Sequence, residues 1–384
     1  MSVASRALAV LAAVACAAGR SAAAQEGNGL ELSRSLYPLV YWQSSSGWTL
    51  RGVLRYSAPA PPDRPEINAV DVGISAFIGT EDYRGVDIAM YAPALVDGWR
   101  FLIIGRIIRE SRFGFYGLGN DTPRDPDLVT DTSEHYYQLR RVSALGRADI
   151  HRRIVGRLRA FAGLAYRKSD FSALPGTTLF GDQIVAGAID STDLEGLAFA
   201  ARFGLVVDTR DKEFDPRRGF LGEVIVEGDG DFNRVTARAL GVVSPARRLR
   251  LAARAAGERM DGDWPLSEAF WMETSWTAFS ALGGYYTHRG LRNNRFVGPG
   301  KLILSTEVRY DFIRIPTLFE LVGVAFVDGG RVFDHAEWDV TLKDIHWGGG
   351  VGVAAKVYTS TLFGVTFGVS ADGITGDLGF GWSY

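Results

Sequence analysis

Residues 363–370 read Phe363-Gly364-Val365-Thr366-Phe367-Gly368-Val369-Ser370, and this stretch decides the fold. Every second residue is large and apolar, whereas the residues between them are glycine, threonine or serine. Successive side chains of a β-strand point to opposite faces, so the stretch predicts a strand with one apolar face and one small or polar face. The same alternation recurs over residues 197–208, 302–312 and 377–384.

Three features of these stretches favour a membrane barrel over a soluble β-sandwich. The predicted strands are about 10 residues or longer, as in membrane barrels, whereas strands of globular proteins average about five or six. Their polar face carries charges such as Glu307 and Arg309, and the last strand ends in an aromatic residue. The composition, with 46 glycines and 12% aromatic residues, is also typical of such barrels. The predicted fold class is all-β, a transmembrane antiparallel up-and-down β-barrel of about 16 strands.

The alternation predicts where these strands lie. We expect them near residues 37–43, 47–57, 67–79, 82–91, 97–110, 134–148, 150–167, 193–207, 219–229, 231–242, 246–257, 301–312, 319–329, 346–358, 361–370 and 375–384. An even number of strands places both termini of the chain on the periplasmic side of the barrel. Long outward loops are then expected at residues 111–133, 168–192, 258–300 and 330–345.

The first 24 residues predict a secretory signal peptide. A basic start, Met1 to Arg6, is followed by an apolar run, Ala7 to Ala18, and by the small residues Ala22-Ala23-Ala24. The apolar run is about a dozen residues long, which is short of the roughly 20 that span a bilayer. Lipoprotein processing at Cys16, the single cysteine, remains the alternative to cleavage after Ala24. We therefore expect a signal peptide at residues 1–24, a short periplasmic segment at 25–36 and the outer-membrane barrel at 37–384.

The distribution of charge and the lack of catalytic and metal-binding motifs argue against other classes of function. Charged residues make up 22% of the chain, are spread along its length and give a net charge of −2, so no nucleic-acid partner is expected. The chain has no G-x-S-x-G elbow, and the spacing around His288, His335 and His346 matches no metal site. We expect no enzymatic activity, no catalytic residue, no metal and no cofactor.

An arginine-rich turn, His288 to Phe296, lies in the long loop before the strand that carries Glu307. The next predicted strand contains Asp328, so a folded-in loop brings Arg289 to two acids. A buried guanidinium needs such partners, because an uncompensated charge is expensive whereas a bidentate pair with a carboxylate is tolerated and directional. We expect Arg289 to act as an internal latch that pairs with Asp328 and Glu307.

A second charged segment lies between two predicted strands. Pro216 fixes φ and Gly219 permits turn conformations. Three acids, Asp208, Asp211 and Asp215, can accept backbone hydrogen bonds in a tight connection. The segment therefore predicts a shaped turn, although a solvated charged hairpin would have the same composition.

These motifs together resemble the barrel domain of the BamA/TamA-type outer-membrane superfamily, which includes the two-partner secretion transporters. The resemblance covers about residues 37 to 384, and the motifs occur in the family's order. It implies a periplasmic turn motif formed by Asp208, Arg210, Asp211, Asp215, Pro216 and Gly219. It implies a structural latch formed by Arg289, Gly290, Glu307, Phe326, Asp328 and Gly330. The last strand is also similar to the terminal assembly signal of outer-membrane barrels, which here comprises Phe380, Trp382 and Tyr384.

The resemblance also implies a function. It predicts a protein of the Gram-negative outer membrane with a role in membrane assembly or in transport of protein or lipid. Its implied partners are outer-membrane lipid, the outer-membrane assembly machinery for its own insertion, and a protein or lipid client. Two features depart from the family: residues 25–36 leave no room for periplasmic modules, and Leu291 stands where an aromatic residue is usual. A structural or passive-pore barrel without client-insertion activity is therefore the alternative.

Overall fold

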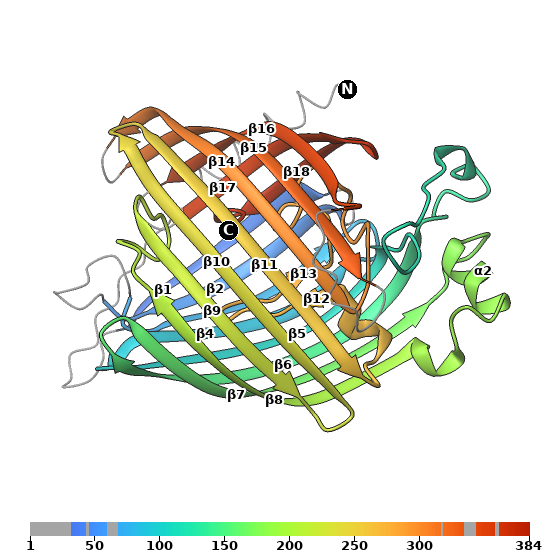
Figure 1. Cartoon of the computed structure of the whole chain (residues 1–384), viewed down its shortest axis with the longest axis horizontal. Helices are drawn as coiled ribbons and strands as arrows, with labels where there is room; N and C mark the ends of the chain where they lie inside the picture. Colours follow the sequence, from blue (N-terminus) through green and yellow to red (C-terminus); the bar gives the residue numbers. More distant parts are fainter. Residues whose placement is uncertain (1–31, 44–45, 60–67, 316–317, 334–342, 358–360) are drawn as a thin grey trace. The chain divides into compact units, whose positions relative to one another are not determined.

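In the part of the chain that the structure describes, sixteen strands form a single antiparallel sheet in which neighbouring strands follow one another in chain order. The computed structural model describes residues 32–43, 46–59, 68–315, 318–333, 343–357 and 361–384. The strands of the sheet are β1 (Ser33–Gln43), β2 (Gly47–Ser57), β3 (Asp71–Gly79), β4 (Arg84–Val96), β5 (Trp99–Gly114), β6 (Gln138–Val155), β7 (Leu158–Ser172), β8 (Glu195–Asp208), β9 (Gly219–Gly228), β10 (Phe232–Ala246), β11 (Leu249–Gly262), β14 (Gly300–Ile315), β15 (Phe319–Phe333), β16 (His346–Val357), β17 (Thr361–Ser370) and β18 (Gly373–Phe380) (Figure 1).

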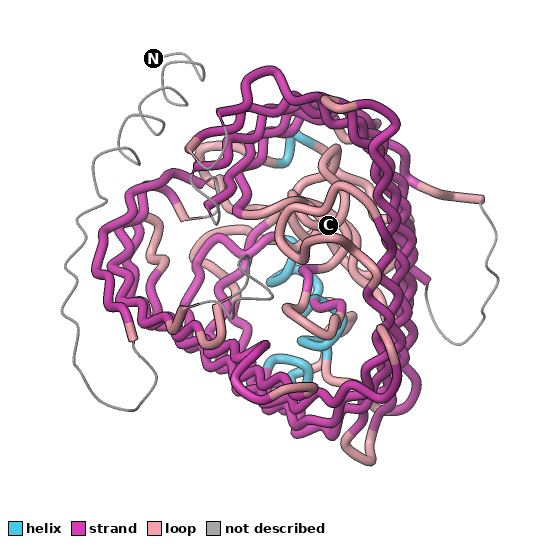
Figure 2. The backbone as a smooth tube through the Cα atoms, turned by 90° about the vertical axis from the view of Figure 1, so that its left-hand side faces the viewer, coloured by secondary structure: helices cyan, strands magenta, loops and turns pink. Residues whose placement is uncertain are grey.

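The connections contain a few short elements. Two two-residue strands, β12 (Trp271–Met272) and β13 (Phe279–Ser280), pair within the connection from β11 to β14. The helical elements are α2 (Leu179–Val185) and the 3₁₀ turns η1 (Pro126–Leu128), η2 (Ser191–Leu194) and η3 (Leu266–Phe270). Figure 2 distinguishes the strands, in magenta, from the loops in pink and these turns in cyan. Within the described residues, no helix has both the length and the apolar character needed to cross a membrane.

The chain divides into two compact units. The first contains the described residues of Met1–Phe113, Gln138–Arg153 and Phe161–Ala200. The second contains the described residues of Gly114–Tyr137, Ile154–Ala160 and Ala201–Tyr384. All of the site residues predicted from the sequence fall in the second unit.

The burial pattern of β8 is the inverse of that of a soluble protein. The large apolar side chains Phe199 and Phe203 are 60% and 58% exposed, whereas Ala200 and Arg202 are fully buried. In the same way, Val224 and Val226 of β9 are exposed and Glu223 and Glu227 are buried. An exposed apolar face opposite a buried polar face is the pattern of strands that meet lipid on one side.

The predicted number of strands is confirmed, but some predicted ends are wrong. β1 begins at Ser33 rather than at residue 37, because Ser33 pairs with Ser57 of β2 through both hydroxyl and backbone groups. Part of the predicted 25–36 segment is therefore strand. β18 ends at Phe380 rather than at residue 384, because Gly381 adopts a φ of +82° and turns the chain. The predictions for residues 1–24, including Cys16, lie outside the described residues.

The exposed apolar face predicts how the strands respond to charge. Val224 lies at the middle of β9, is 48% exposed and pairs with Leu205. We expect Val224→Arg to lower the free energy of unfolding by about 2–4 kcal/mol, since an arginine at bilayer mid-depth must leave water. Asn233→Arg, at the end of β10, is the matched control, with an expected loss of about 0–1 kcal/mol. Urea unfolding in phospholipid vesicles measures both losses, and equal losses would contradict a lipid-facing β9.

Candidate functional site

The long loop, residues 263–299, lies on the polar face of the sheet in the second unit. Arg254 of β11 donates hydrogen bonds from its guanidinium to the carbonyl oxygens of Tyr286 and Thr287, at 2.7 and 3.1 Å. Arg202 of β8 donates to Glu273 of the loop at 2.5 Å. The face that carries these arginines is called the covered face below.

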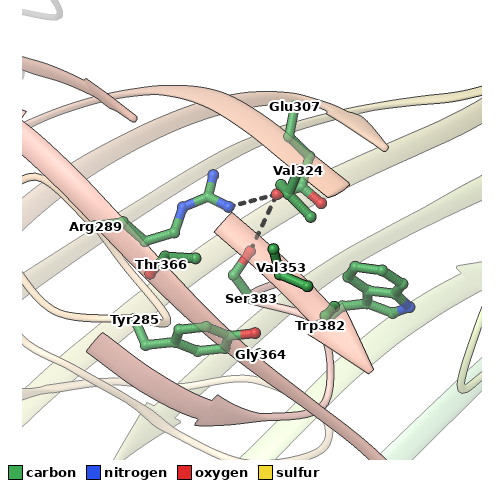
Figure 3. A pocket seen from close by; sticks show the side chains of 10 residues that line it. Tyr285, Arg289, Glu307, Val324, Val353, Gly364, Thr366, Trp382 and Ser383 are labelled. Atoms are coloured by element: carbon green, nitrogen blue, oxygen red, sulfur yellow. Dashed lines mark hydrogen bonds and ion pairs between the residues drawn. The ribbon is translucent and has the colours of Figure 1, made fainter. Parts of the chain in front are cut away.

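Arg289 projects from the long loop to two acids of the covered face. Its Nε and Nη2 donate to the two carboxylate oxygens of Asp328 on β15, both at 2.8 Å, and its backbone N–H donates to the same carboxylate at 3.0 Å. Its Nη1 donates to Glu307 on β14 (Figure 3). All three side chains are at most 2% exposed. The geometry is the bidentate, charge-assisted pairing that the sequence predicts for Arg289, Glu307 and Asp328.

The remaining predicted latch residues surround this pair. The Phe326 ring lies 3.8 Å from the Arg289 guanidinium carbon, so it stacks on the cation. Gly290 leaves little room for a side chain, since a Cβ there would lie 3.1 Å from the Val369 carbonyl oxygen, a tight contact. The loop tip is also tied to β17, because the Ser370 hydroxyl donates to the Gly290 carbonyl oxygen at 2.7 Å.

The Arg289 guanidinium remains charged although it is buried. Burial alone lowers the pKa of Arg289, but the hydrogen bonds and charge of Asp328, together with the charge of Glu307, outweigh it, so the pKa lies above its ordinary value. Glu307 is shared, because Arg309 of β14 also donates to it. The two arginines and two acids therefore form one continuous charge network.

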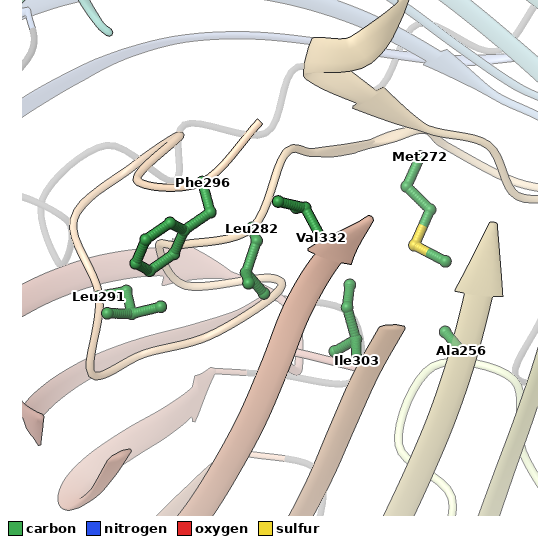
Figure 4. Packing of buried hydrophobic residues seen from close by; sticks show 7 residues of the cluster. All are labelled: Ala256, Met272, Leu282, Leu291, Phe296, Ile303 and Val332. Atoms are coloured by element: carbon green, nitrogen blue, oxygen red, sulfur yellow. The ribbon is translucent and has the colours of Figure 1, made fainter. Parts of the chain in front are cut away.

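Gly330 and Leu291 contribute to packing beside the latch. A Cβ on Gly330 would meet the side chain of Leu282, so the glycine permits close approach of the long loop. Leu291 packs in a buried apolar cluster, which comprises Ala256, Met272, Leu282, Leu291, Phe296, Ile303 and Val332 (Figure 4). The Phe326 ring stacks on the Arg289 guanidinium.

Most residues of the turn motif between β8 and β9 make contacts within the turn. The Asp208 carboxylate accepts two hydrogen bonds from the Arg210 guanidinium, both at 2.9 Å. The Asp211 carboxylate accepts hydrogen bonds from the backbone N–H groups of Arg217 and Arg218, at 2.9 and 3.3 Å. Pro216 is buried, and Gly219 has a φ of +114°, which favours glycine. These residues form the shaped turn that the sequence predicts.

Asp215 differs from the prediction. Instead of accepting backbone hydrogen bonds of the turn, it binds Arg250 of β11 at 2.5 Å and Lys356 of β16 at 2.8 Å, and accepts from the indole N–H of Trp382 at 2.9 Å. Burial alone raises the pKa of Asp215, but these two cations outweigh it and hold the pKa well below the usual range. Asp215 is therefore a buried charge partner rather than a turn residue.

A second charge network was not predicted from the sequence. Arg202, Glu227 and Arg234 are connected by ion pairs of 2.9 Å, and Lys301 pairs with Glu258 at 2.6 Å. Two acids of the long loop complete it: Glu268 pairs with Arg234 at 3.0 Å and Glu273 with Arg202 at 2.5 Å. The signal was present as charged residues at alternate positions of β8 to β11 and β14, but the sequence does not show which of them pair.

The C-terminal part of the long loop, around Arg295 and Phe296, contacts other segments of the second unit. Arg295 pairs with Asp372 at 2.7 Å and donates to the hydroxyl and carbonyl oxygens of Thr122, at 2.8 and 2.7 Å. Asn120 accepts the backbone N–H of Val332 at 3.0 Å. The Phe296 ring stacks on His346, with centroids 3.8 Å apart. The loop is therefore held at both its tip and its return.

The three predicted assembly-signal residues do not share a face. Phe380 is 45% exposed, on the apolar side of β18. Beyond Gly381, Trp382 and Tyr384 turn toward the covered face, where the Trp382 ring lies 3.8 Å from the guanidinium carbon of Arg309. The continuous alternation expected up to residue 384 therefore stops at β18.

No group of three or more histidine, cysteine, aspartate or glutamate side chains in the described part of the chain is arranged to hold a metal ion. His288 and His346 contact backbone groups instead: the His288 ring lies 3.0 Å from the His346 carbonyl oxygen, and the His346 ring lies 3.0 Å from that of Asn120. His335 lies outside the described residues. The expected lack of enzymatic activity remains a prediction.

The latch predicts the effect of removing its arginine. Arg289→Ala removes the cation that binds Asp328 and one of the two that bind Glu307, while both acids stay buried. We expect the free energy of unfolding to fall by about 3–5 kcal/mol. Heat-modifiable gel mobility should be lost at a lower temperature, and protease should cut the long loop sooner. Arg292→Ala, an exposed arginine of the same turn, is the control and should leave both unchanged. Equal behaviour of the two variants would contradict the latch.

His288 makes the latch sensitive to acid. The Gly290 N–H donates to its Nδ1 at 3.2 Å, so the folded loop uses the neutral ring, with Nε2–H directed at the His346 carbonyl oxygen. Burial lowers the pKa of His288, and the nearby Asp328 opposes this only in part. The unfolded chain therefore binds the proton more readily, and stability is lost as pH falls below the ordinary histidine pKa of about 6.5.

We expect protease cutting of the long loop to accelerate between pH 7 and pH 5 in the native protein. The acceleration should be smaller in His288→Gln, whereas His135→Gln, in a different loop, should behave like the native protein. Cutting rates at fixed protease activity measure the effect. The same acid response in His288→Gln would assign the pH dependence to another group.

Comparison with known proteins identifies the family of this chain. The model of the Omp85 superfamily domain matches residues 105–361. The structure is similar to that of BamA from Haemophilus ducreyi lacking POTRA domains 1-3, with a TM-score of 0.53 and 11% sequence identity over 88% of this chain. It is also similar to CdiB from Escherichia coli, with a TM-score of 0.54 and 13% identity over 94% of this chain. No curated protein matches the sequence.

The chain spans 69% of the length of the BamA chain and 63% of that of the CdiB chain. At these identities the likeness shows the fold, which is the predicted β-barrel. The family match extends over the turn motif, the long loop, Glu307 and Asp328, and it confirms the resemblance predicted from those motifs. The chain belongs to the Omp85 superfamily.

Proposed function

We propose that this protein is an outer-membrane barrel that inserts or translocates a protein or lipid client. The observation that carries the proposal is the Arg289 latch, which fixes a loop of the family's type on the covered face. The same loop is also tied to Thr122 and Asp372, and it lies within the Omp85 superfamily match over residues 105–361, which supports the proposal.

The exposed apolar face supports the proposed location. The outward residues of β8 and β9 are large and apolar, and the charges of these strands lie on the covered face. A Gram-negative outer membrane is the environment in which such strands are stable. Outer-membrane lipid is then a direct partner, and the assembly machinery that inserts barrels acts on this chain as well.

A deletion strain tests the function. We expect loss of the gene to reduce other barrel proteins or surface lipids in purified outer membranes, as quantified by mass spectrometry. Expression of the native protein or of Arg292→Ala should restore the composition. Arg289→Ala, produced at an equal level, should restore less than half, since its loop is no longer held.

Two other outcomes of these experiments would lead to different conclusions. An unchanged outer-membrane composition, together with a large and stable conductance of the purified protein in planar bilayers, would identify a passive pore. Restoration by Arg289→Ala as complete as by the native protein would show that the latch serves stability alone.

A further inference from the structure

Two short turns of the second unit present a group of exposed arginines, called the basic rim below. The rim consists of Arg218, at the end of the turn between β8 and β9, and of Arg247 and Arg248, which form the two-residue connection from β10 to β11. All three residues are exposed, and their guanidinium groups have no hydrogen-bond or ion-pair partner among the described residues. The rim therefore offers three uncompensated cations to a ligand.

Contacts between the two turns fix the rim in place. The Arg217 guanidinium donates to the Arg247 carbonyl oxygen at 3.2 Å, and the Ser244 hydroxyl donates to that of Arg217 at 2.8 Å. The backbone N–H of Asp311 on β14 donates to the Arg248 carbonyl oxygen at 2.9 Å. Arg217 is itself neutralised by an ion pair with Asp311, whereas the rim arginines beside it are not. The rim is therefore held by backbone and neighbouring groups that leave its own guanidinium groups available.

Exposed charge is divided between the two ends of the same strands. Asp229 and Asp231, between β9 and β10, and Asp261, near the end of β11, are exposed acids. Because β9, β10 and β11 are antiparallel neighbours, these acids lie at the strand ends opposite the rim. Asp211, an exposed acid at the rim end, accepts backbone N–H groups of its own turn. A negatively charged ligand is therefore attracted to the rim end and repelled from the other.

An open groove of about 630 Å³ lies on the exposed apolar face of the strands that lead to the rim. The small residues Gly241, Ala253 and Thr306 line it and are register partners across β10, β11 and β14, which are neighbours in the sheet (Figure 1). Leu251 and Val308, which pair with each other and also line the groove, are 39% and 42% exposed. Leu251 is separated from the rim by about 10 Å along β11. The volume lies within the roughly 300–1,000 Å³ of sites that hold small molecules.

The groove and the rim together fit the two parts of an anionic phospholipid. A phosphate group accepts paired hydrogen bonds from guanidinium groups, and basic clusters at a membrane surface attract anionic lipids. An acyl chain is apolar and suits a groove on a face that meets lipid. An acidic protein segment would contact the rim but would gain nothing from the apolar groove, so the two features together favour a lipid.

From this geometry we infer that the basic rim and the groove form one binding site for an anionic phospholipid. The headgroup phosphate binds Arg218, Arg247 and Arg248, and an acyl chain lies in the groove over Ala253. The inference rests on the proposed location of the barrel in a membrane, but it does not depend on the insertion of clients.

The test uses purified full-length protein in detergent, with bound lipid quantified by native mass spectrometry. Phosphatidylglycerol is the anionic lipid, and phosphatidylcholine with the same acyl chains is the neutral comparison. We expect the native protein to bind phosphatidylglycerol about tenfold more tightly. The triple variant Arg218→Gln, Arg247→Gln and Arg248→Gln should bind the two lipids within about twofold of each other, because the recognised charge is removed. Arg292→Gln, an exposed arginine of the long loop, is the control and should retain the native preference.

Two leucine variants locate the acyl chain. Ala253→Leu should weaken binding of both lipids about fivefold, because the larger side chain fills part of the groove. Ala255→Leu, on the same strand and the same exposed face but outside the groove lining, is the matched control and should bind both lipids as the native protein does. Heat-modifiable mobility verifies that each variant is folded.

Soluble competitors distinguish the lipid from other anions. Glycerol 3-phosphate, which has the phosphate but no acyl chain, and decaglutamate should not displace phosphatidylglycerol at equal concentration. Displacement by glycerol 3-phosphate would assign the rim to free phosphate, displacement by decaglutamate would assign it to an acidic protein segment, and either would overturn the inference.

Equal binding of the two lipids by the native protein, an unchanged preference in the folded triple variant, or equal effects of the two leucine variants would also overturn it. If the triple variant does not fold, Arg248→Gln alone gives the comparison. It should lower the preference for phosphatidylglycerol about threefold, and an unchanged preference would count against the site. The lipid assay needs no client, so a negative deletion phenotype leaves its result unaffected.

Discussion

The cost of burying charge governs the second unit. Its covered face contains arginines that are nearly inaccessible to water, and each buried cation without a partner would cost several kcal/mol. Ion pairs with Glu307 and Asp328 offset this free-energy cost for Arg289, and ion pairs with Asp215 and Asp311 offset it for Arg250. Because these partners come from strands, a turn and a loop, charge compensation fixes where each segment lies. The apolar cluster around Phe296 adds packing at one end of the same loop.

The fold was predictable because its main signal is local. Period-two alternation requires only neighbouring residues, and it gave the strand number and order. The ends of strands depend on contacts that alternation does not contain. β1 extends to Ser33 through a cross-strand contact with Ser57, and β18 stops where Gly381 takes a left-handed φ, although the aromatic residues continue to alternate.

The latch was predictable for a different reason. The turn contains three arginines, and the resemblance of Arg289-Gly290 to the family's loop tip distinguished Arg289 from the other two. Two acids on adjacent predicted strands were then available as its partners. The second charge network could not be deduced in this way, since Arg202 and Glu273 are 71 residues apart and several acids were equivalent in the sequence. For Asp215 the turn composition was misleading, because an aspartate beside Pro216 suits a turn as well as an ion pair. Only the register of β11 and β16 decides between them.

Residues 381–384, the tail that follows β18, make contacts that can form only late in folding. Trp382 reaches Asp215 across 167 residues, and Ser383 reaches Arg254 across 129. Contacts of such long range form late, because hairpins and intervening strands must first bring their partners together. The turn, β11, β14 and the long loop all contribute to the tail's surroundings, so the tail can be seated only after each is in place. Burial of Trp382 therefore marks the completion of the second unit, because its surroundings exist only once the turn, β11, β14 and the long loop have folded together.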